Sequence, residues 1–87
     1  MTRHKVISVV AGLAALIGPV ERPQQAPLDR VLGRDEHVRH LVWMLGEIVP
    51  FYDAGDTEKA MRWLGYVQGA CVAHGICTID QMRDLVR

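Results

Sequence analysis

The chain has 87 residues, 49% of them hydrophobic, and 10 basic side chains balance 10 acidic ones, so its formal net charge is zero. A chain of this length forms one small domain. The balanced charge argues against a nucleic-acid-binding surface and against an acidic nucleic-acid mimic, because both need a strong field of one sign. It also removes repulsion between copies, so we expect self-association. The 2 cysteines are too few for a disulfide framework.

The first predicted element is a helix over residues 4–17. Its apolar residues share one face at 100° per residue: Val6, Val9, Val10, Leu13, Leu16 and Ile17. The opposite face carries small residues that let a second backbone approach closely, among them Ser8, Gly12 and Ala15. We predict that these three residues form a self-association surface. A strand is the alternative for the β-branched run at residues 6–10, but its apolar residues do not alternate.

The same segment resembles the start of a signal peptide, since Arg3, His4 and Lys5 precede an apolar run. No small-x-small cleavage site follows that run. About 13 apolar residues are also too few to cross a bilayer as a helix. We therefore expect a structural helix rather than a targeting segment, and no membrane partner.

A proline-rich connector is predicted over residues 18–34. Gly18 and Pro19 end the first helix, and Pro23 and Pro27 stiffen the polar stretch that follows. We expect this connector to lie over the surface, with one helical turn at residues 28–32.

The second helix is predicted over residues 35–49. Asp35 is its expected cap, and Glu36 suits the positive end of the helix dipole. Pro50 lacks the N–H that a continuing helix needs, so the helix should end or kink there. The apolar stripe that should face the core comprises Val38, Leu41, Val42, Leu45, Ile48 and Val49.

Two further helices are predicted over residues 57–74 and 79–86. Asp56 should cap the first of them, and Gly75 should end it in the left-handed conformation. Thr78 and Gln81 match a capping box at the start of the last helix. The sequence therefore predicts an all-α fold, a small bundle of about four helices in a single domain covering residues 1–87.

One set of residues has metal-ligand chemistry: Cys71, His74 and Cys77 at intervals of three, together with His37 and His40. Zinc takes four such ligands in structural sites. Core and cap positions explain Cys71, His74 and Cys77 better than a metal site does, while His37 and His40 lie opposite the apolar stripe and should be in solvent. We therefore expect no metal and no cofactor, and keep a zinc-stabilised domain as an alternative.

No residue set points to catalysis. Cys77 and His74 lack a third group and an oxyanion donor, and Gly65 and Gly69 fall inside a helix rather than in a phosphate-binding loop. We expect a non-enzymatic protein.

A helix-turn-helix regulator is a further alternative, because a short glycine turn joins the last two helices. The last helix presents few base-reading side chains, namely Gln81, Arg83 and Arg87, and Asp80 and Asp84 offset them. We therefore expect no nucleic-acid partner.

Surface recognition is the better supported class. Trp43 lies about 140° from the centre of the second helix's apolar stripe at 100° per residue. It is surrounded by Glu36, Arg39, His40 and Glu47, a composition typical of an interface anchor. We predict that these five residues bind a partner. The alternative is that Trp43 covers the connector or the first helix.

A second surface is predicted on the outer side of the third helix. Gly65 and Gly69 form a small-xxx-small pair that permits close helix packing, within the chain or across a dimer. We assign Gly65 and Gly69 to self-association, and their neighbours Arg62 and Tyr66 to partner binding.

The segments RWLGYVQG at residues 62–69 and TIDQMR at residues 78–83 resemble small open reading frames of bacteriophage and prophage genomes. The resemblance covers the C-terminal third to half of the chain, and it departs at His74 and Cys77, where simple helix-end residues are expected. It implies a small accessory protein, cytoplasmic in a bacterial host, that binds a host protein or protein complex. Proteins of this kind include inhibitors of CRISPR effectors and of other defence complexes. Because the balanced charge and the small-residue faces favour self-association, we expect a homodimer.

Overall fold

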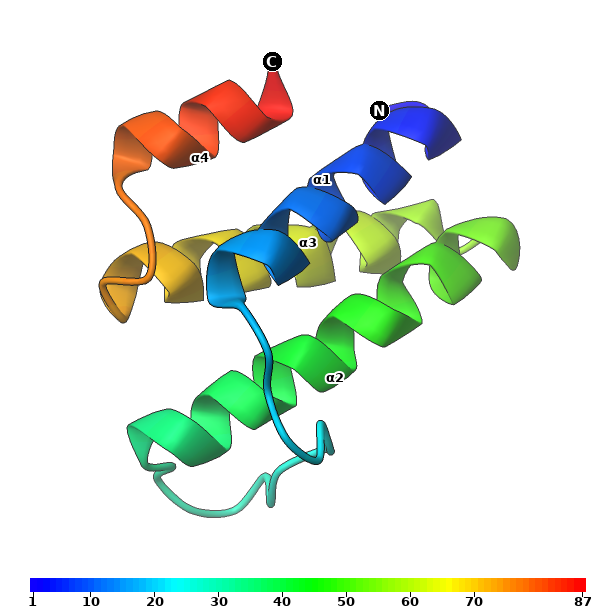
Figure 1. The fold of residues 1–87 in the computed structure, drawn as a ribbon. Helices are drawn as coiled ribbons and strands as arrows, with labels where there is room; N and C mark the ends of the chain where they lie inside the picture. Colours follow the sequence, from blue (N-terminus) through cyan, green and yellow to red (C-terminus); the bar gives the residue numbers. More distant parts are fainter.

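The computed structural model describes all 87 residues and contains four α-helices and no strand, which confirms the predicted all-α bundle. The helices are α1 (Arg3–Ile17), α2 (Arg34–Asp53), α3 (Thr57–Ala73) and α4 (Ile79–Val86). α2 and α3 form a hairpin with the most extensive interface of the molecule, and α1 packs against both (Figure 1). α4 lies against α1 and α3, at the end of the molecule opposite the connector (Figure 1).

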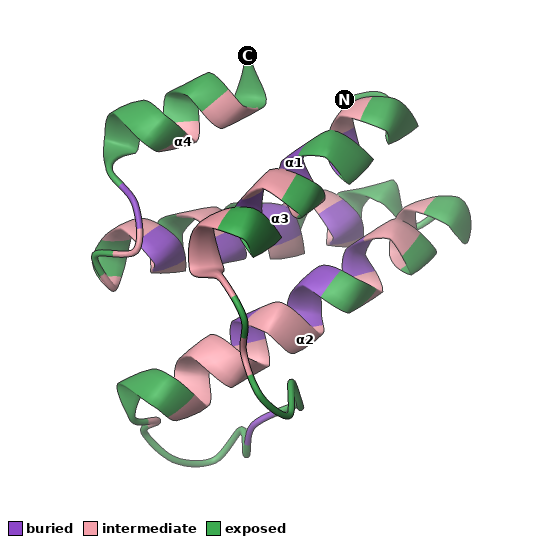
Figure 2. Cartoon of the chain, in the orientation of Figure 1, coloured by how far each residue is buried: buried purple, intermediate pink, exposed green.

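The core forms where the apolar faces of α1, α2 and α3 meet (Figure 2). Its buried residues are Val6, Val9, Leu13, Leu41, Met44, Leu45, Ile48, Ala60, Leu64, Val67, Cys71 and Cys77. The predicted stripe residues of α1 are either buried or, like Val10, pack against this core, and so do Leu41, Leu45, Ile48 and Val49 of α2. Val38 and Val42, also assigned to the α2 stripe, are half-buried and lie outside the core cluster. Met44 is buried although it was not assigned to the stripe.

The predicted end of the second helix at Val49 is wrong, because α2 continues through Pro50 to Asp53. Proline removes one backbone donor, so the carbonyl of Gly46, four residues earlier, has no N–H to accept. Gly46 and Pro50 are both exposed, and water can satisfy that carbonyl. The extra turn places Phe51 and Tyr52 against the core.

Asp35 is not the cap of α2. The N-cap is Gly33, so no side chain caps the first amides of the helix. Asp35 and Glu36 lie in the first turn, where their negative charge complements the helix dipole. The connector has bends but no helical turn at residues 28–32.

The junction between α3 and α4 agrees closely with prediction. Asp56 caps α3 by accepting from the amide of Lys59. Gly75 has φ +71°, and the amide of Ile76 donates to the carbonyl of Cys71 at 2.9 Å, the pairing of a Schellman motif. Thr78 and Gln81 form both bonds of the capping box.

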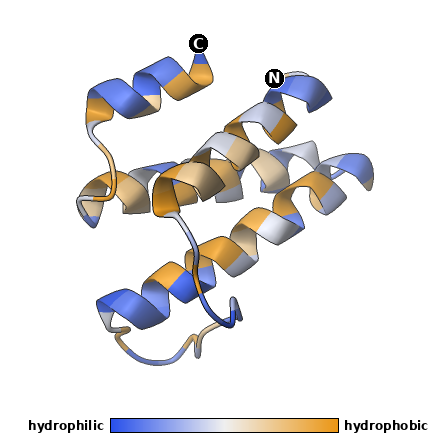
Figure 3. Ribbon diagram, viewed as in Figure 1, coloured by the Kyte–Doolittle hydropathy of each residue, from blue (hydrophilic) through white to orange (hydrophobic).

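α4 is the least embedded helix and has no buried residue. Leu85 packs against the core and over Gly12 of α1, whereas Ile79 is 63% exposed. Figure 3 shows hydrophobic and hydrophilic segments along the ribbon of α4, and Met82 and Leu85 are the apolar residues that pack against the core. None of the four helices combines the length and apolarity that crossing a bilayer requires.

Candidate partner-binding site at the connector

The connector is fixed to the bundle at Ala26. Its backbone N–H donates to Nδ1 of His40 at 3.0 Å, and Ala26 is only 5% exposed. Because Nδ1 accepts this bond, His40 is neutral and carries its proton on Nε2. The prediction that His40 lies in solvent is therefore wrong: the polar connector covers the side of α2 that periodicity assigned to water.

A second attachment lies close to the start of α2. Arg30 makes a bidentate ion pair with Glu36, with Nη1 donating to Oε1 at 2.8 Å and Nη2 to Oε2. The guanidinium holds the pKa of the Glu36 carboxyl below its usual range. The bidentate geometry fixes the direction of the chain as well as its position.

Around these two attachments the connector exposes apolar side chains. Leu28 is 80% exposed and Val31 is 94% exposed, the largest values among the large hydrophobic residues of the chain. Asp29 lies between them and forms no ion pair. An anchored segment that projects apolar groups is suited to insertion into a pocket on another molecule.

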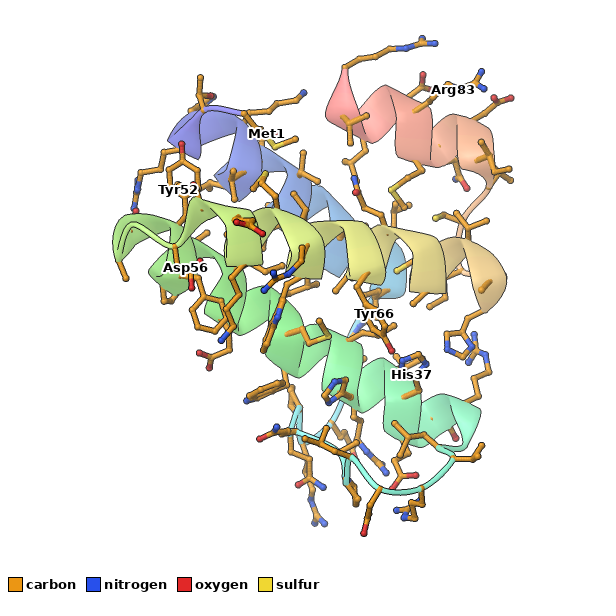
Figure 4. All side chains as sticks on the ribbon, turned by 180° about the vertical axis from the view of Figure 1, so that it is seen from behind. Met1, His37, Tyr52, Asp56, Tyr66 and Arg83 are labelled. Atoms are coloured by element: carbon orange, nitrogen blue, oxygen red, sulfur yellow. The ribbon has the colours of Figure 1, made fainter.

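Beside the connector, hydrogen bonds link three polar side chains in a row: His74 at the C-cap of α3, His37 of α2 and Tyr66 of α3. Nδ1 of His37 lies 2.7 Å from Nε2 of His74, and Nε2 of His37 lies 2.8 Å from the hydroxyl of Tyr66. The labelled side chains of His37 and Tyr66 meet in Figure 4. The contact between the imidazoles needs one donor and one acceptor, so His37 and His74 cannot both be doubly protonated. His37 is thus not in solvent either, contrary to prediction.

This environment shifts the histidines toward the neutral form. Burial, followed by the nearby His74 and His40, lowers the pKa of His37. Burial alone lowers the pKa of His40. Both directions agree with the hydrogen bonds, since the neutral ring is the form that accepts.

A cleft of about 350 Å³ lies between the connector and the two helices. Its walls are Leu28 and Leu32 of the connector, His37 and His40 of α2, and Tyr66 of α3, which is 51% exposed. His40 of α2 and Tyr66 of α3, both predicted as partner-binding residues, therefore line one cleft, and Glu36, also predicted, holds Arg30 of its wall.

Trp43 is not the exposed anchor that was predicted. It is half-buried and packs against the core, with its ring centroid 5.4 Å from that of His40 and 5.6 Å from that of Trp63 on α3. Trp63 in turn meets Phe51 edge-on, at 4.9 Å between centroids. α3 thus supplies one neighbour of Trp43, through Trp63.

The other predicted surface residues are spread over the molecule. Arg39 and Glu47 are half-buried on α2, and Arg62 is exposed, 3.4 Å from Glu58. Ser8 and Ala15 are exposed on α1.

The predicted self-association glycines divide into two kinds. Gly12 is unsuitable, because α4 of the same chain covers it: a methyl group on its Cα would lie 2.0 Å from Cδ1 of Leu85. Gly65 and Gly69 are exposed, and no atom lies within 4 Å of the position of a Cβ at either. The outer face of α3 is therefore open to another molecule.

The five residues with metal-ligand chemistry do not assemble. No cluster of three or more His, Cys, Asp or Glu side chains has a geometry that could hold a metal ion. Cys71 and Cys77 are buried in the core, and burial raises the pKa of the Cys71 thiol to about 11 and also raises that of Cys77. His37 and His74 instead bond to each other. The structure gives the zinc alternative no ligand set.

Sequence reasoning missed three connector residues, Ala26, Leu28 and Val31. One signal was present, since large apolar residues stand in a stretch otherwise read as a polar surface connector. In such a context an apolar residue is either an anchor or a contact group, and here Ala26 is the first while Leu28 and Val31 are the second.

Comparison of the chain with protein-family models, with curated proteins and with solved structures found no match.

Proposed function

We propose that the protein acts by binding another protein, and that the contact is made by its connector surface, defined as Leu28, Val31 and the exposed Tyr66 beside them. The observation that carries the proposal is the exposure of Leu28 and Val31, at 80% and 94%, on a segment attached to the bundle on both sides of Leu28. Removing exposed apolar groups from water is favourable, and an anchored segment loses little conformational entropy when it docks.

The finer part of the proposal concerns the partner. The resemblance to phage and prophage reading frames supports a bacterial host protein or complex, with the protein as its inhibitor and defence complexes such as CRISPR effectors as the first candidates. A small protein that acts by occupying a pocket needs no catalytic group, and a rigid apolar loop is sufficient for that role.

The regulator alternative receives less support from the charges of α4. Arg83 lies 3.9 Å from Asp80, and Arg87 lies 3.2 Å from Asp84. The two arginines and two aspartates balance, so this helix offers no net positive charge to a phosphate backbone.

The experiment is affinity capture from a bacterial lysate with three tagged chains. These are the wild type, the double variant Leu28→Asp/Val31→Asp, and Ile7→Ser, a control at a 38% exposed residue of α1 outside the connector. We expect a defined host complex with the wild type and the control, and its loss with the double variant.

Three results would contradict the proposal. Equal recovery with the double variant would exclude the connector surface, and recovery of nucleic acid alone, in a salt-sensitive manner, would exclude protein binding. An excess of the protein that leaves the captured complex fully active would exclude the inhibitor role.

A further inference from the structure

A second exposed apolar feature lies at the opposite end of the molecule from the connector. It is a groove of about 480 Å³ between α3 and α4. Its walls include Gly69 and Val72 of α3 and Ile79, Met82 and Val86 of α4. The groove exists because α4 is short and packs through Leu85, which leaves Ile79 63% and Val86 37% exposed.

Two properties define what the groove can accept. The backbone at Gly69 is uncovered, since no atom lies within 4 Å of the position of a Cβ there, so an incoming chain can approach α3 closely. Arg83 is the only charged side chain of the lining; the carboxylate nearest to it, Asp80 at 3.9 Å, is 89% exposed and lies outside the groove. A fitting occupant therefore presents apolar side chains next to a negative charge.

The connector has this chemistry. Leu28 and Val31 project from it, and Asp29, which has no ion-pair partner in the molecule, lies between them. Within one molecule this contact is impossible, because the connector and α4 lie at opposite ends of the bundle (Figure 1). Figure 4 likewise shows Arg83 on the side away from His37 and Tyr66.

We propose that the connector of one copy docks into the α3–α4 groove of a second copy, with Leu28 and Val31 in the groove and Asp29 facing Arg83. The zero net charge leaves no long-range repulsion to oppose the approach. The contact joins two different surfaces, so one contact leaves a free connector on one copy and a free groove on the other. This inference rests on the proposed function only in that both use the connector; self-association and partner binding then compete for it.

The test compares molar mass by light scattering at increasing concentration, without any partner. The loop variant is Leu28→Asp/Val31→Asp, and the groove variant is Ile79→Asp/Val86→Asp. Each changes exposed residues, and an acid at position 79 suits the first turn of α4, so both should keep the wild-type circular dichroism. We expect the wild type and the Ile7→Ser control to associate, and each variant to dissociate roughly 10- to 100-fold more readily.

The decisive measurement is an equimolar mixture of the two variants. The loop variant keeps its groove and the groove variant keeps its loop, so the mixture should regain association and stop at the dimer. A mixture that stays monomeric, a wild type that stays monomeric at millimolar concentration, or a single variant that associates as the wild type does would each overturn the inference.

Charge exchange gives a second check. Asp29→Arg or Arg83→Glu alone should weaken association by roughly 2- to 5-fold, since the pair is solvent-exposed. Both changes in one chain should restore it, and failure to restore would overturn the assignment of Asp29 to Arg83.

The two proposals can fail separately. Loss of host capture by the loop variant with a strictly monomeric wild type would remove this inference and leave the proposed function. Association that returns in the mixture of the two variants, together with host capture that the loop variant retains, would support this inference and remove the proposed function.

Discussion

Cδ1 of Leu85 occupies the space where Gly12 has no side chain: a methyl group on the Gly12 Cα would lie 2.0 Å from it and 3.1 Å from Cγ. This contact holds α4 on α1, together with a hydrogen bond of 2.7 Å from Nζ of Lys5 to the main-chain oxygen of Arg87. A glycine that periodicity assigned to an outer face is thus an internal contact.

Replacing Gly12 with a larger residue should therefore weaken the packing of α4 on α1. Elsewhere in a helix, glycine to alanine stabilises by about 0.5–1 kcal/mol, and Gly46→Ala is the matched control because nothing lies near its Cβ position. We expect Gly12→Ala to lose this gain, since Leu85 must move, and to speed amide hydrogen exchange in α4. In a Leu85→Ala background the gain should return, as urea unfolding in a double-mutant cycle would measure. Equal gains at Gly12 and Gly46 would contradict the contact.

Pro50→Ala should stabilise the protein. Proline inside a helix costs about 3 kcal/mol, partly offset by about 0.4–1 kcal/mol from a stiffer unfolded chain. Pro50 lies in the last turns of α2, so we expect a smaller gain, about 1–2 kcal/mol in the free energy of urea unfolding. A loss of stability would show that α2 needs the proline for its final geometry.

His40→Ala should release the connector. It removes the acceptor for the Ala26 amide, and an unsatisfied buried donor costs about 1–3 kcal/mol. Because the loss is local, tryptic cleavage after the exposed Arg30 should accelerate roughly tenfold, while global unfolding changes less. The control is His4→Ala, at an exposed residue of α1. Unchanged cleavage in the His40 variant would mean that the Arg30–Glu36 pair holds the connector alone.

The histidine cluster predicts a defined dependence on pH. The folded protein lowers the pKa of His37 and of His40 from 6.5, so the unfolded chain binds more protons just below that value. The free energy of unfolding should be constant above 6.5 from this source and fall as pH drops through it, by at most about 1.4 kcal/mol per unit for each histidine. Urea unfolding between about pH 7.5 and 5.5 measures the slope. The double variant His37→Gln/His40→Gln should show a smaller slope, and an unchanged one would assign the effect to other groups.

The two thiols should be unreactive in the folded protein. The pKa of Cys71 is raised to about 11 and that of Cys77 is also raised, so thiolate is scarce near neutral pH, and both side chains are buried. We expect a disulfide reagent to label neither at neutral pH and both in denaturant, with Cys77, at 7% exposure, first during local opening. Fast native labelling of Cys71 would contradict the packing of α3.

Much of this protein is determined by its sequence alone. The apolar faces of α1, α2 and α3 follow from a spacing that puts every third or fourth residue on one side, and such stripes are buried wherever the helices meet. The ends of α3 and α4 follow from Asp56, Gly75 and Thr78, because a cap satisfies amides or carbonyls within a few residues of itself. The all-α class rests on these local rules.

The tertiary structure alone decided what covers the outer faces. Periodicity placed His37, His40 and Trp43 in solvent, since it records only which residues share a side of a helix. The connector covers His40, α3 provides partners for His37 and Trp43, and α4 covers Gly12. These contacts join residues between 14 and 73 positions apart, as His40 with Ala26 and Gly12 with Leu85 illustrate. The site at the connector depends on such long-range contacts, and no local pattern encodes them.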